Sequence, residues 1–318
     1  MLHTFAKLVA GCTVLLVLAG SLVTSTGSGL SVPDWPTTYG WNMFTFPPSK
    51  WVGGIFFEHG HRLIASIVGC LTIILTAWLW TAESRRWIKR LGAIALGAVV
   101  LQGLLGGLTV LFFLPDAISV AHAGLAEIFF CLTVSLALFT SPTWIRGDAR
   151  VDDAVLRGTA TATTALIYAQ ILVGAVMRHT GAGLAIPDFP LMFGHVMPDH
   201  WDSGIAVHFA HRVGALLVAS SVIATSGHIW YHHRPQAALT RPAMLIVALV
   251  VLQVTLGALT VLSKRNMWIN SVHVVCGALV LATSLVITLR SWRVRFSDAI
   301  DSSRVRLQAD QTPMGIRA

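Results

Sequence analysis

The chain has 318 residues, of which 55% are hydrophobic and only 11% are charged, and its mean hydropathy is +0.72. This composition excludes a soluble domain of that length and is typical of a protein embedded in membrane lipid. The formal net charge of +8 does not indicate a nucleic-acid partner, because the basic residues are distributed by membrane side.

Eight apolar runs of about 20 residues follow one another along the chain, and a helix of that length crosses the hydrocarbon layer of about 30 Å. Lipid offers the backbone no hydrogen bonds, and the runs lack the alternating pattern of membrane-barrel strands. We therefore expect an all-α membrane protein with spans at residues 8–25, 61–80, 92–113, 119–139, 158–177, 208–230, 242–262 and 271–290.

The basic residues predict the orientation of these spans. Most of the 22 Lys and Arg residues lie before the first span, after the second, fourth and sixth, and beyond the eighth. Such residues favour the cytoplasmic side. We therefore expect a multi-pass protein of the cell inner membrane with both termini in the cytoplasm. The first run has no convincing cleavage site and is expected to be retained.

Two halves of the chain repeat each other. "TGSGLSVPDWP" from Thr26 recurs as "TGAGLAIPDFP" from Thr180, and "LQGLLGGLTVL" from Leu101 recurs as "LQVTLGALTVL" from Leu252. Four spans in each half predict two tandem four-helix bundles with pseudo-two-fold symmetry along the membrane normal. The expected units are an N-terminal bundle at 1–140, a cytoplasmic linker at 141–157, a C-terminal bundle at 158–295 and a polar cytoplasmic tail at 296–318.

Four histidines lie near the outer ends of the even-numbered spans: His61, His122, His211 and His273. Ionisable residues within spans are rare and usually face a bundle interior or a cavity. Two imidazoles on facing helices can supply both axial ligands of a haem iron. Zinc or copper is the weaker alternative, because no cysteine or carboxylate cluster completes a compact ligand set around either pair.

Other residues near these histidines fit the same interpretation. Arg62 and Arg212 directly follow two of the ligands, where each guanidinium can meet a haem propionate near the periplasmic face. Small residues leave room for a macrocycle, or serve plain helix contacts: these are Gly60, Gly106, Gly107, Gly124, Gly257 and Gly277. The aromatic residues of the loop at 26–57 form either a headgroup girdle or a lid over a flat apolar ligand. By contrast, His228, His232 and His233 are expected at a solvated cytoplasmic helix end.

The two halves differ at one position of this pattern. An offset of 150 residues aligns His61 with His211 and also sets Glu58 against His208. A carboxylate beside a haem edge can act as a general base when a C–H bond is oxidised. The N-terminal bundle is therefore expected to be chemically active and the C-terminal bundle to store electrons. The alternative is that Glu58 only orients His61 or Arg62.

Together these residues resemble the haem A synthases, membrane enzymes that convert haem O to haem A for terminal oxidases. The resemblance covers nearly the whole chain and rests on Glu58-x-x-His61-Arg62, "AHAGLAE" around His122, "HFAHR" ending at Arg212, "NSVHVVCG" around His273, and the "TGSGL" and "PDWP" loop motifs. It implies that His61 and His122 flank the substrate haem O, that His211 and His273 ligate the iron of a haem b, and that Glu58 is needed for catalysis. The loop at 26–57 lacks the cysteine pair that some members carry.

The resemblance also implies a reaction and partners. The C8 methyl group of haem O would be oxidised to a formyl group through an alcohol. A haem O synthase, the assembly of a terminal oxidase, and quinone or another membrane electron carrier are the implied partners, and a homo-oligomer is left open. A rival interpretation is a bis-histidine di-haem cytochrome that passes electrons from quinol without modifying haem. A transporter is a third, less favoured because the ionisable groups lie at one surface and not at the midplane.

Overall fold

The computed structural model describes residues 1–146 and 151–293, and its regular structure within these ranges is helical. The long helices are α1 (Leu2–Ser25), α2 (Gly54–Ala82), α3 (Arg86–Leu111), α4 (Asp116–Phe139), α6 (Ala154–His179), α7 (Ser203–His232), α8 (Ala237–Leu262) and α9 (Met267–Ser291). Short elements are α5 (Pro142–Arg146) and the 3-10 turns η1 (Met43–Thr45), η2 (Pro48–Lys50) and η3 (Ala182–Leu184). The tail expected at 296–318 lies outside the described residues.

All eight long helices are long and apolar enough to cross a membrane, which confirms the eight predicted spans. Several begin earlier than the apolar pattern indicated. Helix α2 starts at Gly54 and has 29 residues, and α7 starts at Ser203 and has 30. The polar residues at their outer ends remain helical because their side chains find partners in the adjoining loops. The helices therefore extend through the headgroup layer as well as the hydrocarbon.

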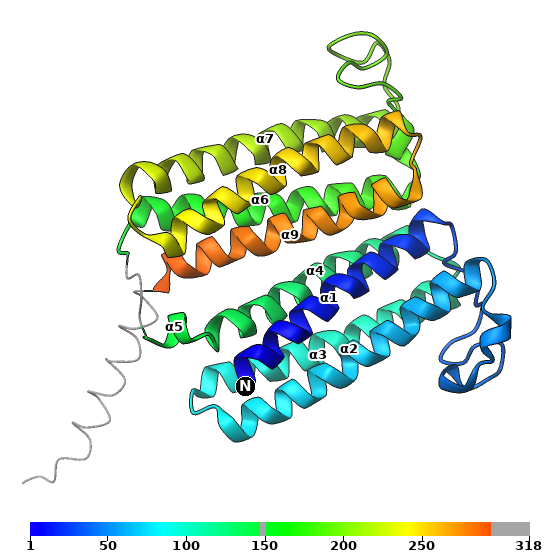
Figure 1. The fold of residues 1–318 in the computed structure, drawn as a ribbon. Helices are drawn as coiled ribbons and strands as arrows, with labels where there is room; N and C mark the ends of the chain where they lie inside the picture. The colour runs from blue at the N-terminus through cyan, green and yellow to red at the C-terminus, as the bar shows by residue number, and fades with distance from the viewer. Residues whose placement is uncertain (147–150, 294–318) are drawn as a thin grey trace, which may run out of the picture.

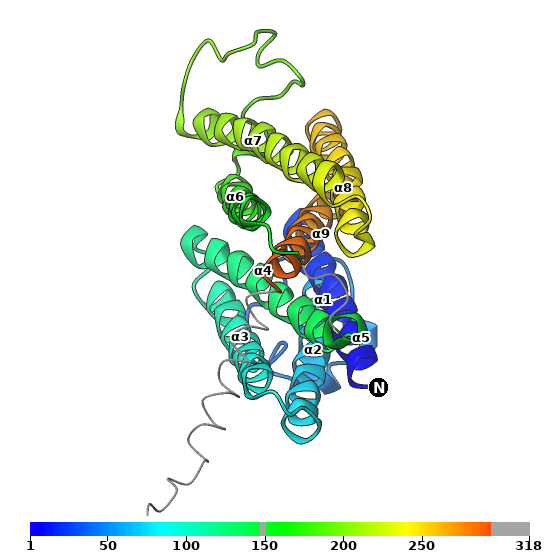
Figure 2. The ribbon, with the colours of Figure 1, turned by 90° about the vertical axis from the view of Figure 1, so that its left-hand side faces the viewer.

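The helices form two neighbouring groups (Figure 1). Contacts in the first group join α1 to α2, α2 to α3, α3 to α4 and α4 back to α1, and α6 to α9 form a second ring in the same way. Consequently α2 and α4 lie on opposite corners of one ring, and α7 and α9 on opposite corners of the other. Each ring surrounds its own buried apolar cluster. Figure 2, turned by 90°, shows α9, α1 and α4 in the region between the groups.

The loops at 26–53 and 180–202 leave the same end of the helices (Figure 1). At the opposite end, α5 forms a short turn within the segment expected to be a linker. Its Trp144 is buried in the apolar cluster of the first ring and lies 4.8 Å from Phe139, centroid to centroid. Two apolar residues, Trp144 and Ile145, in a polar stretch are a weak signal, so the sequence did not predict this turn.

Polar contacts join the two rings near the loop end. Arg178 of α6 donates to the carbonyl oxygen of Ser21 at 2.6 Å and to the hydroxyls of Ser21 and Ser25 at 3.1 and 2.8 Å. On α9, Asn270 donates to the Ser25 hydroxyl at 3.2 Å, and the Ser271 and Ser25 hydroxyls lie 2.9 Å apart. Hydrogen bonds to a charged group are stronger than neutral ones, especially away from water.

We expect Arg178→Ala to lower the free energy of unfolding by about 2 kcal/mol, because the acceptors at Ser21 and Ser25 lose a charged donor. Thermal unfolding of the detergent-solubilised chain measures this effect. Arg86→Ala, at an exposed position of α3, is the matched control and should unfold near the parent temperature. Equal unfolding temperatures for both variants would contradict the role given to Arg178.

Candidate functional site

The four predicted histidines lie on the helices at opposite corners of the rings, His61 on α2, His122 on α4, His211 on α7 and His273 on α9. The first ring therefore contains His61 and His122, and the second ring contains His211 and His273. Each pair faces the interior of its own bundle.

Each imidazole lies against a glycine of the preceding long helix. A Cβ atom placed on the glycine would stand within 3.2 Å of the ring carbon Cε1 in all four cases: 3.0 Å from Gly20 to His61, 3.2 Å from Gly106 to His122, 2.9 Å from Gly174 to His211 and 3.2 Å from Gly257 to His273. The rings thus occupy space that any other side chain would fill. Gly106 and Gly257 were predicted, whereas Gly20 and Gly174 were missed because isolated glycines in a span carry no distinctive signal.

The remaining predicted glycines have other neighbours. Gly107 contacts Trp35, Gly124 contacts Leu172 and Tyr168, and Gly277 contacts Gln253, whereas a Cβ at Gly60 would meet nothing within 4 Å. Gly124 and Gly277 therefore permit helix and side-chain contacts. Only the glycines opposite the four histidines shape the surroundings of the imidazoles.

The imidazoles keep nitrogen atoms that the protein does not use. The Nδ1 atoms of His61, His122 and His273 are buried without a hydrogen-bond partner among the described residues. A buried polar atom without a partner is costly, and its presence in three equivalent side chains needs an explanation. An axial ligand of haem iron requires one free ring nitrogen. The residues present therefore fit a haem iron in each bundle.

Glutamine side chains contact three of the four histidines. Gln102 donates to the carbonyl oxygen of His122 at 2.9 Å, and Gln253 lies 3.4 Å from Nε2 of His273. Gln170 donates to the carbonyl oxygen of His211 at 2.7 Å and lies 3.0 Å from its Nδ1. Gln102 and Gln253 belong to the repeated "LQ" motif, a signal that was available in the sequence.

His61 has no such glutamine. The offset of 154 residues that relates Gly20 to Gly174 places Leu16 where the second ring has Gln170. Within the described part of the chain, His61 is therefore the only one of the four imidazoles without a contact to a glutamine side chain. This is a difference between the halves that the histidine pattern alone does not reveal.

Arg62 and Arg212 hold the two external loops. Arg62 donates to the carbonyl oxygens of Val32, Asp34 and Thr37 at 2.8, 2.7 and 3.1 Å. In the second half, Arg212 donates to those of Ile186, Asp188 and Leu191 at 3.2, 2.6 and 2.9 Å. Most guanidinium N–H groups are thereby used within the protein. The expected contact with haem propionates stays a prediction, and the structure gives both arginines a loop-holding role beside it.

Glu58 and His208 occupy equivalent places and make an equivalent bond. Both side chains are buried. The Val32 amide donates to Oε2 of Glu58 at 2.8 Å, and the Ile186 amide donates to Nδ1 of His208 at 3.2 Å. Only Glu58 also pairs with its arginine, at 2.7 Å from Oε1 to Arg62. This ion pair supports the alternative in which the Glu58 carboxylate orients the Arg62 side chain.

Two aspartates close equivalent turns in the loops. Asp34 accepts hydrogen bonds from the amides of Tyr39 and Gly40 at 2.7 and 2.8 Å. In the second loop, Asp188 accepts from the amides of Phe193 and Gly194, both at 2.8 Å. Gly40 and Gly194 have φ of +75° and +82°, a conformation that glycine adopts without a steric penalty. The hydrogen bond from the Gly194 amide lowers the pKa of the Asp188 carboxyl below its ordinary value.

The first loop reaches over the end of its bundle. A Cβ atom on Gly107 of α3 would stand 2.6 Å from the indole of Trp35. Farther along the loop, the rings of Phe46 and Trp51 lie 5.1 and 4.7 Å from that of His59, which is fully buried. Trp35, Phe46 and Trp51 thus pack onto the protein, whereas Tyr39, Trp41, Phe44 and Phe56 are exposed, so the choice between a lid and a headgroup girdle stays a prediction.

The contact between Gly174 and His211 gives a steric prediction. In Gly174→Ala, the new methyl group should push the imidazole away and weaken haem binding in that bundle about tenfold, the effect of about 1.4 kcal/mol of overpacking. The haem-to-protein ratio and the Soret absorption of the purified chain measure this. Gly158→Ala on the same helix meets nothing within 4 Å and should match the parent. Equal haem content in both variants would contradict the contact.

The lowered pKa of Asp188 gives a prediction about pH. The stability that the ionised carboxyl gives the turn is present above its ordinary pKa of 3.8 and is lost as the pH falls through the lower folded value. Hydrogen exchange at the amides of Phe193 and Gly194, corrected for intrinsic rates, should therefore show full protection at pH 5 and loss of protection below about pH 3.8. Loss already at pH 5 would show that the carboxyl does not hold the turn.

Comparison with known proteins identifies the family of the chain. The family model described as cytochrome oxidase assembly protein matches residues 45–285. A haem A synthase of Geobacillus kaustophilus is 29% identical over 300 residues, covering 92% of this chain and 93% of the relative. Those of Halalkalibacterium halodurans and Shouchella clausii are 30% and 32% identical, covering 91% and 78% of this chain and 96% and 83% of the relatives. The chain therefore belongs to the haem A synthase family of cytochrome oxidase assembly proteins.

Proposed function

We propose that the chain oxidises the C8 methyl group of haem O to a formyl group and so produces haem A for terminal oxidases. Relatives named haem A synthase match it over most of their length. The observation that carries the proposal is the inequivalence of two otherwise matched sites. Each bundle has a glycine-backed imidazole pair, but only the first has a buried carboxylate one helical turn before a histidine. The rival di-haem cytochrome has no support from these relatives.

The proposal assigns haem O to the bundle with His61 and His122, and haem b to the bundle with His211 and His273. In the second pair, Gln170 contacts the imidazole of His211 and Gln253 contacts that of His273. These contacts suit a haem that stays in place. Without a glutamine contact, His61 is freer to move as a substrate enters and its product leaves. Haem b, when bound, supplies one-electron redox chemistry.

In this proposal Glu58 accepts the proton that is released as the C–H bond is oxidised. The carboxylate suits that role because it is buried and lies within the same helical turn as His61. Arg62 and the Val32 amide fix its two oxygen atoms. The aligned side chain, His208, is bound to the loop in the same manner but has no carboxylate, so the second bundle stores electrons. Quinone or another membrane electron carrier would accept the electrons and water would supply the formyl oxygen, so that the methyl group and one water molecule give the formyl group, four protons and four electrons.

The membrane orientation and the tandem arrangement belong to the same proposal. Both long loops lie at one end of the helices (Figure 1), and most basic residues lie at the other. This supports cytoplasmic termini and haem sites toward the periplasmic face. The matching loop bonds of Arg62 and Arg212 support two modules related by a pseudo-two-fold axis, 1–140 and 158–295, joined at 141–157. A haem O synthase would supply the substrate, and oxidase assembly would use the product.

Replacement of the proposed base tests the function. Glu58→Gln keeps an acceptor for the Val32 amide but removes the charge, so haem content should stay near that of the parent. Formation of haem A should fall at least about 100-fold, the usual contribution of a general base. Co-expression with a haem O synthase, followed by chromatography of the extracted haems, measures both quantities.

The matched control is His208→Gln at the aligned position, which should still produce haem A within about tenfold of the parent rate because it removes no base. If Glu58→Gln forms haem A as fast as the parent, the role of Glu58 is wrong. A parent chain that binds haem and never yields haem A would refute the function as a whole.

A further inference from the structure

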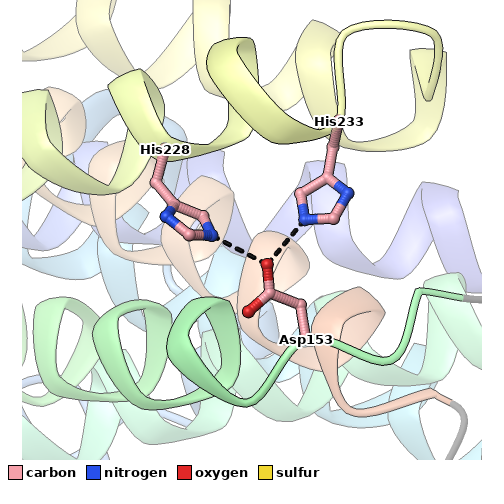
Figure 3. Close-up of side chains that lie close together, drawn as sticks. All are labelled: Asp153, His228 and His233. Carbon is pink, nitrogen blue, oxygen red and sulfur yellow. Dashed lines mark hydrogen bonds and ion pairs between the residues drawn. The ribbon is translucent and has the colours of Figure 1, made fainter.

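A cluster of three side chains lies at the end of the helices opposite the external loops. Nε2 of His228 and Nε2 of His233 each lie 2.7 Å from the same carboxylate oxygen, Oδ2 of Asp153 (Figure 3). Each residue offers one possible ligand atom, and the three atoms all lie within 4.8 Å of one another. His228 is in the last turns of α7, His233 caps its end, and Asp153 caps the start of α6.

We propose that this cluster binds a divalent transition-metal ion, with Zn²⁺ as the best match. Two imidazoles and one carboxylate are ligands that Zn²⁺ takes in proteins, and a water molecule completes the tetrahedron. The other carboxylate oxygen of Asp153 accepts a hydrogen bond from the Leu156 amide at 2.9 Å. Such a bond orients a ligand in the way that outer contacts do in known metal sites.

Electrostatics and tautomers favour a cation at this place. The C-terminal end of α7 carries the negative end of its helix dipole, and the Asp153 carboxylate offsets the positive end of α6, which it caps. The guanidinium of Arg157, one helical turn after Asp153, pairs with Asp152 at 2.5 Å and so is balanced by a charge other than that of Asp153. In the absence of a metal, each imidazole donates its Nε2 proton to Asp153. Metal binding needs only that this proton move to Nδ1, because neutral imidazole exists in both forms.

The site would fasten the second bundle and not the first. It joins α6, which carries Gly174 and Gln170, to α7, which carries His211. The offset of 150 residues aligns His228 and His233 with Trp78 and Glu83. Tryptophan supplies no metal ligand, so the first bundle has no equivalent site at these positions. The side chains of the cluster are 15 to 20% exposed, so an ion can enter from the cytoplasmic side.

The test is Zn²⁺ binding to the full chain, purified in detergent through a tag without histidines and stripped with a chelator. Competition with a fluorescent chelator should give about one Zn²⁺ per chain with a dissociation constant of about 1 µM or lower. Asp153→Asn, His228→Ala and His233→Ala should each weaken binding at least about 30-fold. His195→Ala and Asp199→Asn, an exposed histidine and aspartate of the external loop, are the controls and should stay within about threefold of the parent.

Two features keep the result decisive. Asparagine caps helices as well as aspartate does, so Asp153→Asn preserves the start of α6. Zn²⁺ should also raise the unfolding temperature of the parent by about 3 °C and leave the three variants unchanged. The proposal is overturned if the parent binds no Zn²⁺ below about 10 µM, or if the three variants bind it as the parent does. If Zn²⁺ bound instead to the four bundle histidines, the three variants would bind it as the parent does. This outcome does not depend on whether the chain makes haem A.

Discussion

The contact between an imidazole and a glycine of the preceding helix underlies the arrangement of both bundles. It recurs four times with nearly the same spacing, and in each case a Cβ atom would meet Cε1 of the ring. A span in lipid gains little from burying one apolar side chain in place of another, so close backbone approach decides how the helices pack. The glycines let α1, α3, α6 and α8 approach the histidine-bearing helices. They also leave room for each imidazole ring beside the preceding long helix.

The external loops depend on the same helices through a second repeated contact. Arg62 and Arg212 rise from the outer turns of α2 and α7 and bind backbone carbonyl oxygens. Carbonyl oxygens are present whatever side chains the loops carry. The two loops can therefore differ in length and in aromatic content and still be held in the same place. The indole of Trp35 in the first loop packs against Gly107, whose counterpart in the second half is Ala258.

The spans and the four histidines were accessible from the sequence because lipid imposes a composition and because the repeat marks equivalent positions. The grouping of the histidines into two pairs was expected because all four lie near the outer ends of even-numbered spans, two in each half of the chain. The glycines opposite His61 and His211 could not be predicted, because small residues are common in membrane helices. The spacing of residues along one helix does not show which residue of another helix it contacts. Likewise, the bond of His228 to Asp153 joins residues 75 positions apart. No local pattern reports such a contact, and the sequence indicated only a solvated helix end there.

The exchange of Glu58 for His208 leaves Arg212 without a carboxylate on its own helix, whereas Arg62 has one at 2.7 Å. Asp34 in the first half and Asp188 in the second hold equivalent turns, so these two carboxylates do not distinguish the halves. The arginine that holds the second loop therefore lacks the ion pair that its counterpart has in the first half. One side chain thus makes the surroundings of His211 unlike those of His61, because two histidines in matched positions differ in the group that lies one helical turn before them.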